Sequence, residues 1–112
     1  MKIGVKNYED VYVLSLKGKL MGGPETTAVH DKVKELIEED KKKVVLDLSK
    51  VKWMNSSGLG VIMGCFTSLK NAGGELKICG ATEKVKSLFM ITKLVTLFES
   101  YKNVKEAVES FK

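Results

Sequence analysis

The sequence predicts an α/β fold with a partly parallel sheet. Short runs of β-branched and apolar residues alternate with longer segments whose apolar residues recur at helical spacing. Glycines and the single proline separate these segments, so the connections between them are short. The chain has 112 residues, of which 44% are hydrophobic and 29% charged, which suits one packed domain. We therefore expect a single domain over residues 1–112.

The first part of the chain predicts two strands followed by a helix. Residues 11–16 are rich in β-formers, and residues 2–6 can pair with them as a short first strand. The Gly22-Gly23-Pro24 run breaks the chain, and proline suits the first position of a helix because its missing N–H costs nothing there. The helix is expected to run from about 24 to 41. Its apolar stripe consists of Val29, Val33, Leu36 and Ile37.

The rest of the chain repeats the order of strand and helix. The pattern predicts a strand over 44–48, a loop over 49–55, a helix over about 57–71, a strand over Glu75–Cys79, a helix capped by Thr82, an edge strand over 97–99 and a last helix from 104 to 111. The buried face of the 57–71 helix is expected to contain Leu59, Ile62, Met63, Phe66 and Leu69. The order of strands in the sheet does not follow from this pattern.

Charge and hydropathy exclude several classes of protein. All 19 basic residues are lysine, and they are interspersed with 14 acidic residues. Arginine is the main reader of guanine edges, so its absence argues against direct nucleic-acid binding. The longest nearly apolar run, from Leu59 to Phe66, is far shorter than the ~20 residues of a membrane span. The N-terminus has no apolar signal segment, so we expect a cytoplasmic protein without membrane insertion.

No catalytic, metal or cofactor site is expected. Cys65 and Cys79 are far apart and have apolar neighbours, which is typical of buried, reduced thiols. With His30 as the only imidazole, they do not make a four-ligand metal set. Motifs of dinucleotide sites, phosphate loops and nucleophile elbows are absent. His30 is expected to be a surface or boundary residue, and the protein is not expected to be an enzyme.

The segment Asn55-Ser56-Ser57-Gly58-Leu59-Gly60 departs from an ordinary helix start. Glycine inside a helix costs about 1 kcal/mol relative to alanine, yet two glycines fall in its first turn. Two explanations remain open. The turn packs closely against the sheet, with Ser56 or Asn55 as the N-cap, or another molecule's backbone must come close to it.

A serine hydroxyl at such a helix start is also well placed to carry a phosphate. The free N–H groups and the positive end of the helix dipole stabilise an added charge of about −1.5 to −2. The same dianion would disrupt a partner docked on this small-residue surface. The segment is therefore consistent with a phosphorylation switch.

Three stretches are more specific than any motif considered above. They are Val44-Val45-Leu46-Asp47-Leu48-Ser49, Trp53-Met54-Asn55-Ser56-Ser57-Gly58-Leu59-Gly60 and Asn71-Ala72-Gly73-Gly74. Together they resemble the STAS domain of bacterial anti-sigma factor antagonists. The likeness extends from Val11 to Phe111, with Gly18-Lys19-Leu20 similar to the turn before that family's first helix and Val85 to Thr92 similar to its third. It implies the STAS fold, with a mixed sheet of four to five strands and helices mainly on one face.

The resemblance also implies a partner-switching role. In that family the unmodified antagonist binds an anti-sigma factor that is itself a serine kinase, which frees a sigma factor. The kinase ends the binding by phosphorylating the first serine of the pair, and a PP2C-type phosphatase restores it. On this chain the phosphoacceptor would be Ser56. The partner-binding surface would comprise Met21, Gly22, Gly23, Asn55, Ser56, Ser57 and Gly58.

Three positions depart from the family pattern. Asn55 stands where an aspartate commonly precedes the phosphoacceptor, Met21 replaces a second common aspartate, and Lys19 replaces a further acid. All three changes remove negative charge from the expected docking face. Either the partner is adapted to this face, or the chain is a non-phosphorylated STAS scaffold or accessory subunit of a nucleotide-sensing or lipid-transport assembly.

Overall fold

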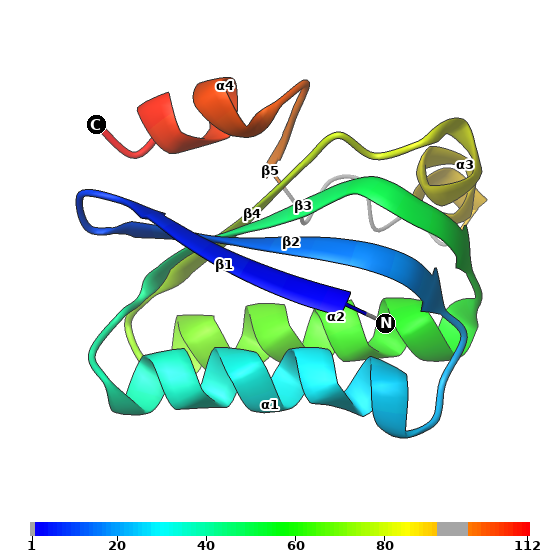
Figure 1. Ribbon diagram of the computed structural model, residues 1–112, viewed down its shortest axis with the longest axis horizontal. Helices are drawn as coiled ribbons and strands as arrows, with labels where there is room; N and C mark the ends of the chain where they lie inside the picture. The colour runs from blue at the N-terminus through cyan, green and yellow to red at the C-terminus, as the bar shows by residue number, and fades with distance from the viewer. Residues whose placement is uncertain (1, 92–98) are drawn as a thin grey trace.

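A computed structural model describes residues 2–91 and 99–112 (Figure 1). Its elements are β1 (Lys2–Tyr8), β2 (Val11–Leu20), α1 (Pro24–Glu38), β3 (Lys43–Met54), α2 (Ser56–Asn71), β4 (Glu75–Cys79), α3 (Glu83–Ile91), β5 (Glu99–Tyr101) and α4 (Val104–Glu109). The strands form one sheet in the order β1-β2-β3-β4-β5. β1 is antiparallel to β2, and the remaining neighbours are parallel. The mixed α/β fold expected from the sequence is confirmed.

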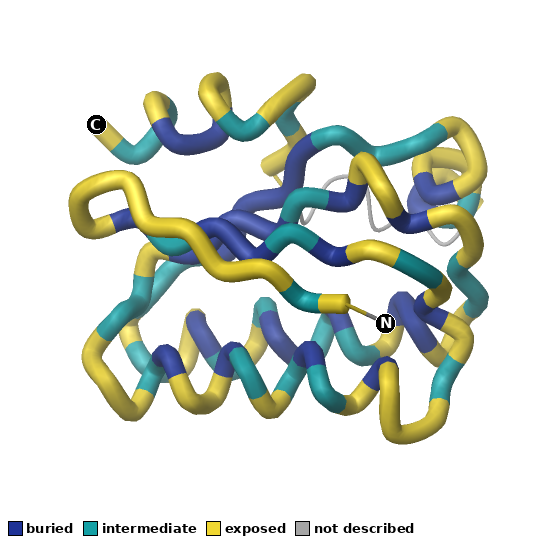
Figure 2. Tube along the Cα trace, viewed as in Figure 1, coloured by how far each residue is buried: buried dark blue, intermediate teal, exposed yellow. Residues whose placement is uncertain are grey.

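The helices cover the two faces of the sheet unequally. α1 and α2 lie side by side beneath one face, and α4 lies on the other (Figure 1). The larger core cluster joins the strands to α1, α2 and α3. A smaller cluster joins Ala107 and Val108 of α4 to the outer face of β2, β3 and β4, which is the face turned away from α1 and α2. The tube in Figure 2 shows both as buried segments on either side of the strands. Helices therefore pack mainly on one face, as expected.

β3 is longer than the sequence suggests. It continues to Met54, so the loop predicted over 49–55 is wrong. The register between β2 and β3 shifts twice, and each time β3 carries one extra residue, as at Lys52 between Val51 and Trp53. Val51 is buried, whereas Lys52 and Trp53 are both exposed. Such bulges interrupt the alternation by which a strand is recognised in a sequence.

β2 also extends further than predicted. The stretch Gly18-Lys19-Leu20 was expected to be a turn, but it pairs with β3 as the last part of β2. Gly18 has a φ of 131°, which a side chain would disfavour, and it lies at the second register shift. The turn itself follows at Met21–Gly23. Because Leu20 pairs with Met54, this turn lies beside the last residues of β3.

Smaller differences concern element ends. α1 stops at Glu38 rather than about 41, and Asp40 then adopts a φ of 62°, which is not helical. α2 begins at Ser56, one residue early, because Asn55 is the cap. Of the edge strand predicted over 97–99, only Glu99 lies within the described residues, where it begins β5. Thr92, the expected end of the third helix, is also outside them.

Two predictions about the interior are confirmed. Cys65 and Cys79 are free, buried thiols, and burial raises the pKa of each to about 12. They therefore stay protonated at neutral pH. His30 is half-buried between α1 and α2, where its Nε2 lies 3.0 Å from Oγ of Ser68. It is a boundary residue that joins the two helices.

A buried lysine fastens α4 to the sheet edge. The side chain of Lys77 is 5% exposed, and its Nζ lies 3.1 Å from Glu99 and 3.4 Å from Glu75. It also donates to Ser110 Oγ at 2.8 Å and lies 4.2 Å from the centre of the Phe111 ring. Burial alone lowers the pKa of this ammonium, but the two carboxylates outweigh it and hold the pKa above its usual value. Lys77 therefore stays charged and pairs β4, β5 and the end of α4.

Candidate functional site

The predicted site residues come together at one end of the sheet. β2 and β3 are parallel neighbours that end in register, with Leu20 opposite Met54. Their continuations, the Met21–Gly23 turn and the first turn of α2, therefore lie against each other (Figure 1). The residues brought together are Met21, Gly22, Gly23, Asn55, Ser56, Ser57 and Gly58. All seven of the predicted partner-binding positions thus lie at one end of the sheet, and among them only Gly58 is buried.

Asn55 connects the two segments. Its Oδ1 accepts a hydrogen bond from the N–H of Gly58 at 3.0 Å, which caps α2. Its Nδ2 donates to the carbonyl of Met21, also at 3.0 Å. Its own N–H donates to the carbonyl of Leu20 at 3.2 Å. One amide side chain therefore both starts the helix and fixes the neighbouring turn, a pair of roles that a carboxylate could not fill because it has no donor.

Variants of Asn55 separate these two roles. Asn55→Ala loses both and is expected to destabilise the fold by about 1–2 kcal/mol. Asn55→Asp keeps the cap acceptor, favoured by the helix dipole, and loses only the bond to Met21, so it is expected to cost less than about 1 kcal/mol. Urea unfolding followed by circular dichroism measures both. Equal losses in the two variants would contradict the capping role.

Gly58 accounts for the close packing that the sequence left open. A Cβ built on Gly58 would collide with the backbone carbonyl oxygen of Leu20 and lie 2.8 Å from its carbonyl carbon. Gly60 differs, since no described atom apart from its chain neighbours and the backbone of its own helix lies within 4 Å of its Cβ position. The close-packing explanation therefore holds for Gly58 but gives no reason for Gly60. Gly60 is exposed in the first two turns of α2 and leaves that surface flat.

The two serines differ in their surroundings, although both are exposed. Ser57 lies against the turn, because a Cβ built on Gly22 would be 3.3 Å from the Cβ of Ser57. Ser56 is the first residue of α2, and no described backbone carbonyl accepts from the N–H of either serine. The start of a helix carries about half a positive charge on such free N–H groups. Ser56 is therefore accessible and lies in a field that stabilises an anion.

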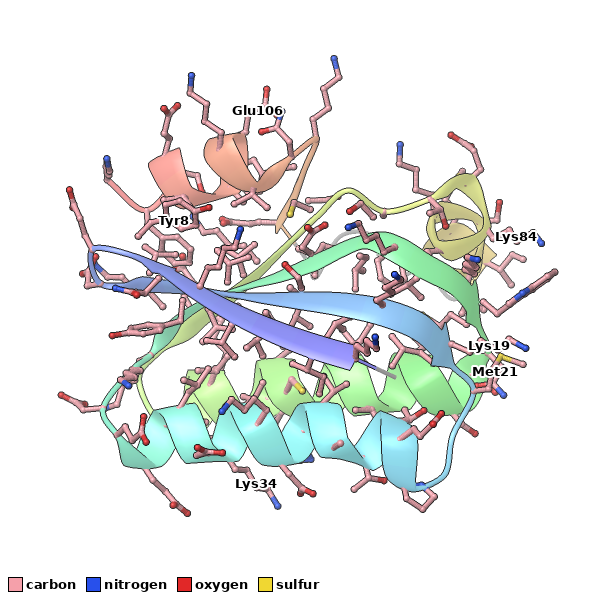
Figure 3. All side chains as sticks on the ribbon, in the orientation of Figure 1. Tyr8, Lys19, Met21, Lys34, Lys84 and Glu106 are labelled. Carbon is pink, nitrogen blue, oxygen red and sulfur yellow. The ribbon has the colours of Figure 1, made fainter. Side chains whose placement is uncertain are left out.

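The surroundings of the site are apolar and basic. Met21 and Trp53 are among the exposed large hydrophobic residues of the described chain, at 48% and 47%. The Nζ of Lys84, from α3, lies 3.2 Å from the centre of the Trp53 ring. Lys19 pairs with Trp53 across the strands, and Figure 3 shows Lys19, Met21 and Lys84 at the same end of the molecule. The first turn of α2 has no acidic residue.

The contact between Trp53 and Lys84 could not be predicted from the sequence. The two residues belong to different elements, and the side on which Trp53 emerges depends on the bulge at Lys52. Within the described part of the chain, no group of three or more His, Cys, Asp or Glu residues is placed to hold a metal ion. Nor is any described helix both long and apolar enough to cross a bilayer.

The sequence of this chain is similar to that of known proteins over most of its length. The model of the STAS domain family matches residues 2–107. The chain is 42% identical over 78 residues to the anti-sigma-B factor antagonist of Listeria monocytogenes, covering 66% of this chain and 68% of that protein. It is 28% identical over 109 residues to the anti-sigma F factor antagonist of Paenibacillus polymyxa, covering 96% and 92%.

The fold is shared with solved structures. SpoIIAA, an anti-sigma factor antagonist, matches in its unphosphorylated form with a TM-score of 0.82 at 17% identity, over 98% of this chain and 96% of that one. The phosphorylated form of SpoIIAA from Bacillus matches with a TM-score of 0.78 at 16% identity, over 99% and 100%. At this level of identity the likeness concerns the fold.

Proposed function

Since the chain belongs to the STAS domain family and its relatives are anti-sigma factor antagonists, we propose that it is an anti-sigma factor antagonist controlled by phosphorylation of Ser56. In the unmodified state it binds an anti-sigma factor through the first turn of α2 and the Met21–Gly23 turn, and a sigma factor is released. The chain acts by binding and performs no catalysis of its own. Its place of action is the cytoplasm, where sigma factors meet RNA polymerase.

The observation that carries this proposal is the position of Ser56. It is the exposed first residue of a helix that is held by Asn55 against the neighbouring turn. A hydroxyl there is open to a kinase, and the helix start stabilises the phosphate by about 0.3–1 kcal/mol. The dianion then stands on the small-residue surface that the partner must approach. SpoIIAA, which has the same fold, has been solved in both states.

The proposed cycle has two covalent steps. The anti-sigma factor acts as a serine kinase, so that Oγ of Ser56 attacks the γ-phosphorus of ATP, ADP leaves and the hydroxyl proton passes to a base of the kinase. A PP2C-type phosphatase reverses the modification with water, which breaks the phosphorus–oxygen bond and releases inorganic phosphate. Both enzymes are separate proteins, and this chain supplies only the accepting hydroxyl.

Mass spectrometry tests the phosphorylation directly. We expect one phosphate on Ser56 when the protein is purified from its native host with phosphatases inhibited. A host that carries Ser56→Ala should show none, and Ser57→Ala should leave the modification in place because Ser57, although exposed, lies against Gly22 of the turn. Phosphate on Ser57 instead would mean that the wrong serine was chosen. Absence of phosphate in every growth condition would favour a non-phosphorylated STAS scaffold or accessory subunit.

A further inference from the structure

The outer face of the sheet, opposite α1 and α2, has a row of lysines. Lys2 of β1 lies opposite Lys17 of β2, and Lys17 lies opposite Lys50 of β3. All three are exposed. Their inward neighbours Ile3 and Leu16 contact the larger core, so alternation directs the lysines outward. Together with Lys19 and Lys52, which follow on β2 and β3, these residues are termed the lysine face.

This arrangement costs folding energy. Like charges directly opposite each other on neighbouring strands destabilise a sheet. No ion pair joins a lysine of this face to a described carboxylate, although Asp47 lines the same hollow of about 230 Å³ as Lys2, Lys17 and Lys50. The Oδ1 atom of Asp47 instead accepts from the N–H of Ser49 at 3.0 Å. Five other lysines of the described residues do pair with carboxylates, namely Lys32, Lys41, Lys42, Lys43 and Lys77.

The lysine face is continuous with the proposed binding site. β2 runs from Lys17 and Lys19 directly into Met21, and β3 runs from Lys52 into Asn55. The bulge in β3 places Lys52 and Trp53 next to each other on the exposed side, and Lys84 adds a further charge over Trp53. A stable protein interface covers about 800 Å² on each partner. One helical turn and one loop supply less than that, so a partner seated at Ser56 extends over neighbouring surface.

We propose that the lysine face is the second half of the partner-binding surface and that it takes an acidic segment of the anti-sigma factor seated at Ser56. This inference rests on the proposed function. Unpaired lysines in a row attract a chain of carboxylates and accelerate its approach. Exposed Trp53 and Met21, at the junction of the two halves, supply the apolar contacts that commonly dominate binding energy. Nucleic acid is the less suitable occupant because the chain has no arginine.

Site-specific crosslinking in the native host locates the partner. A photo-reactive benzoylphenylalanine is placed at Met21, at Lys52, or at Lys34 on the exposed side of α1 as the control. We expect the first two positions to crosslink to the same protein, with the Lys52 product in a segment rich in Asp and Glu, and Lys34 to give neither. Products from Met21 without an acidic product from Lys52 would overturn the lysine face but keep the proposed function. No product from Met21 would contradict both, and nucleic acid crosslinked at Lys52 would overturn this inference.

Charge reversal measures the contribution of the face to association. The protein captured from Met21 is purified, and its association rate is measured with the variant Lys17→Glu, Lys50→Glu, Lys52→Glu. The matched control is Lys34→Glu, Lys105→Glu, Lys112→Glu, which changes the net charge equally at exposed sites elsewhere. We expect the first variant to associate about tenfold more slowly or worse, and the control to stay within about twofold. Equal rates in the two variants would overturn the proposal.

The salt dependence gives a second, independent readout of the same surface. Raising the salt shortens the screening length from about 10 Å at 0.1 M to about 3 Å at 1 M. The wild-type association rate should therefore fall as salt is added, while that of the Lys17, Lys50 and Lys52 variant should change little. The same three lysines are also replaced by Gln, which removes the positive charge without adding negative charge. This variant replaces the Glu variant in the measurement if the Glu variant does not fold. A wild-type rate that does not respond to salt would contradict the proposal.

Discussion

Ser56→Asp is expected to weaken binding to the anti-sigma factor at least tenfold. The carboxylate stands where the proposed phosphate would, on the exposed start of α2, and brings a desolvated charge into the interface. It carries one charge where a phosphate carries about −1.5 to −2, so phosphorylation itself should weaken binding further. Surface plasmon resonance or calorimetry with the protein crosslinked at Met21 measures this change.

Ser56→Asn is the matched control for this experiment. Its side chain has nearly the size and shape of aspartate but no charge, so it is expected to retain most of the affinity. The aspartate variant should also unfold at slightly higher urea than the asparagine variant, because a carboxylate at a helix start adds about 0.3–1 kcal/mol. Weaker binding together with unchanged or greater stability identifies a charge effect. Equal affinities for the two variants would contradict the switch.

Gly58→Ala is expected to destabilise the fold by about 3 kcal/mol. The new methyl group would meet the backbone carbonyl of Leu20, which cannot turn away without losing its bond to the N–H of Asn55. α2 would therefore have to move from the sheet at the end where its cap and the neighbouring turn meet. The free energy of unfolding in urea measures the loss.

Gly60→Ala provides the contrasting variant in the same helix. No described atom obstructs its Cβ, and alanine is favoured over glycine in a helix, so stability should rise by about 0.5–1 kcal/mol. If the gain in stability is accompanied by weaker partner binding, the flat surface at Gly60 serves the partner rather than the fold. A Gly58→Ala variant as stable as Gly60→Ala would contradict the packing argument.

The sequence supported much of the fold because most elements follow regular patterns. β4 was expected over the residues it occupies, and α2 differed by one residue at its start. Asn55 to Gly58 could be predicted as a site because they are consecutive, so a local motif holds them together. The resemblance to a family, rather than any periodicity, placed the Met21–Gly23 turn beside them.

Other features depend on pairing between distant segments, which no local pattern encodes. Residues 49–54 of the predicted loop are strand because β2 offers them a partner, and the two extra residues of β3 obscure the alternation. The row of Lys2, Lys17 and Lys50 follows from register alone, since these residues are far apart in the sequence. In the sequence alone, nothing distinguishes these three lysines from the other lysines of a solvated surface.

The bulge at Lys52 also limits how the length of this chain can vary. Deleting Lys52 would advance each following residue by one place along β3 and into α2 unless the strand slipped back. Ser56 would then occupy the cap position, and Leu59 would meet the Leu20 carbonyl where only glycine fits. Surface segments usually tolerate the deletion of one residue, but deletion of Lys52 should therefore prevent the chain from folding. The extra residue acts as a spacer that sets the rotational phase of α2 against the sheet.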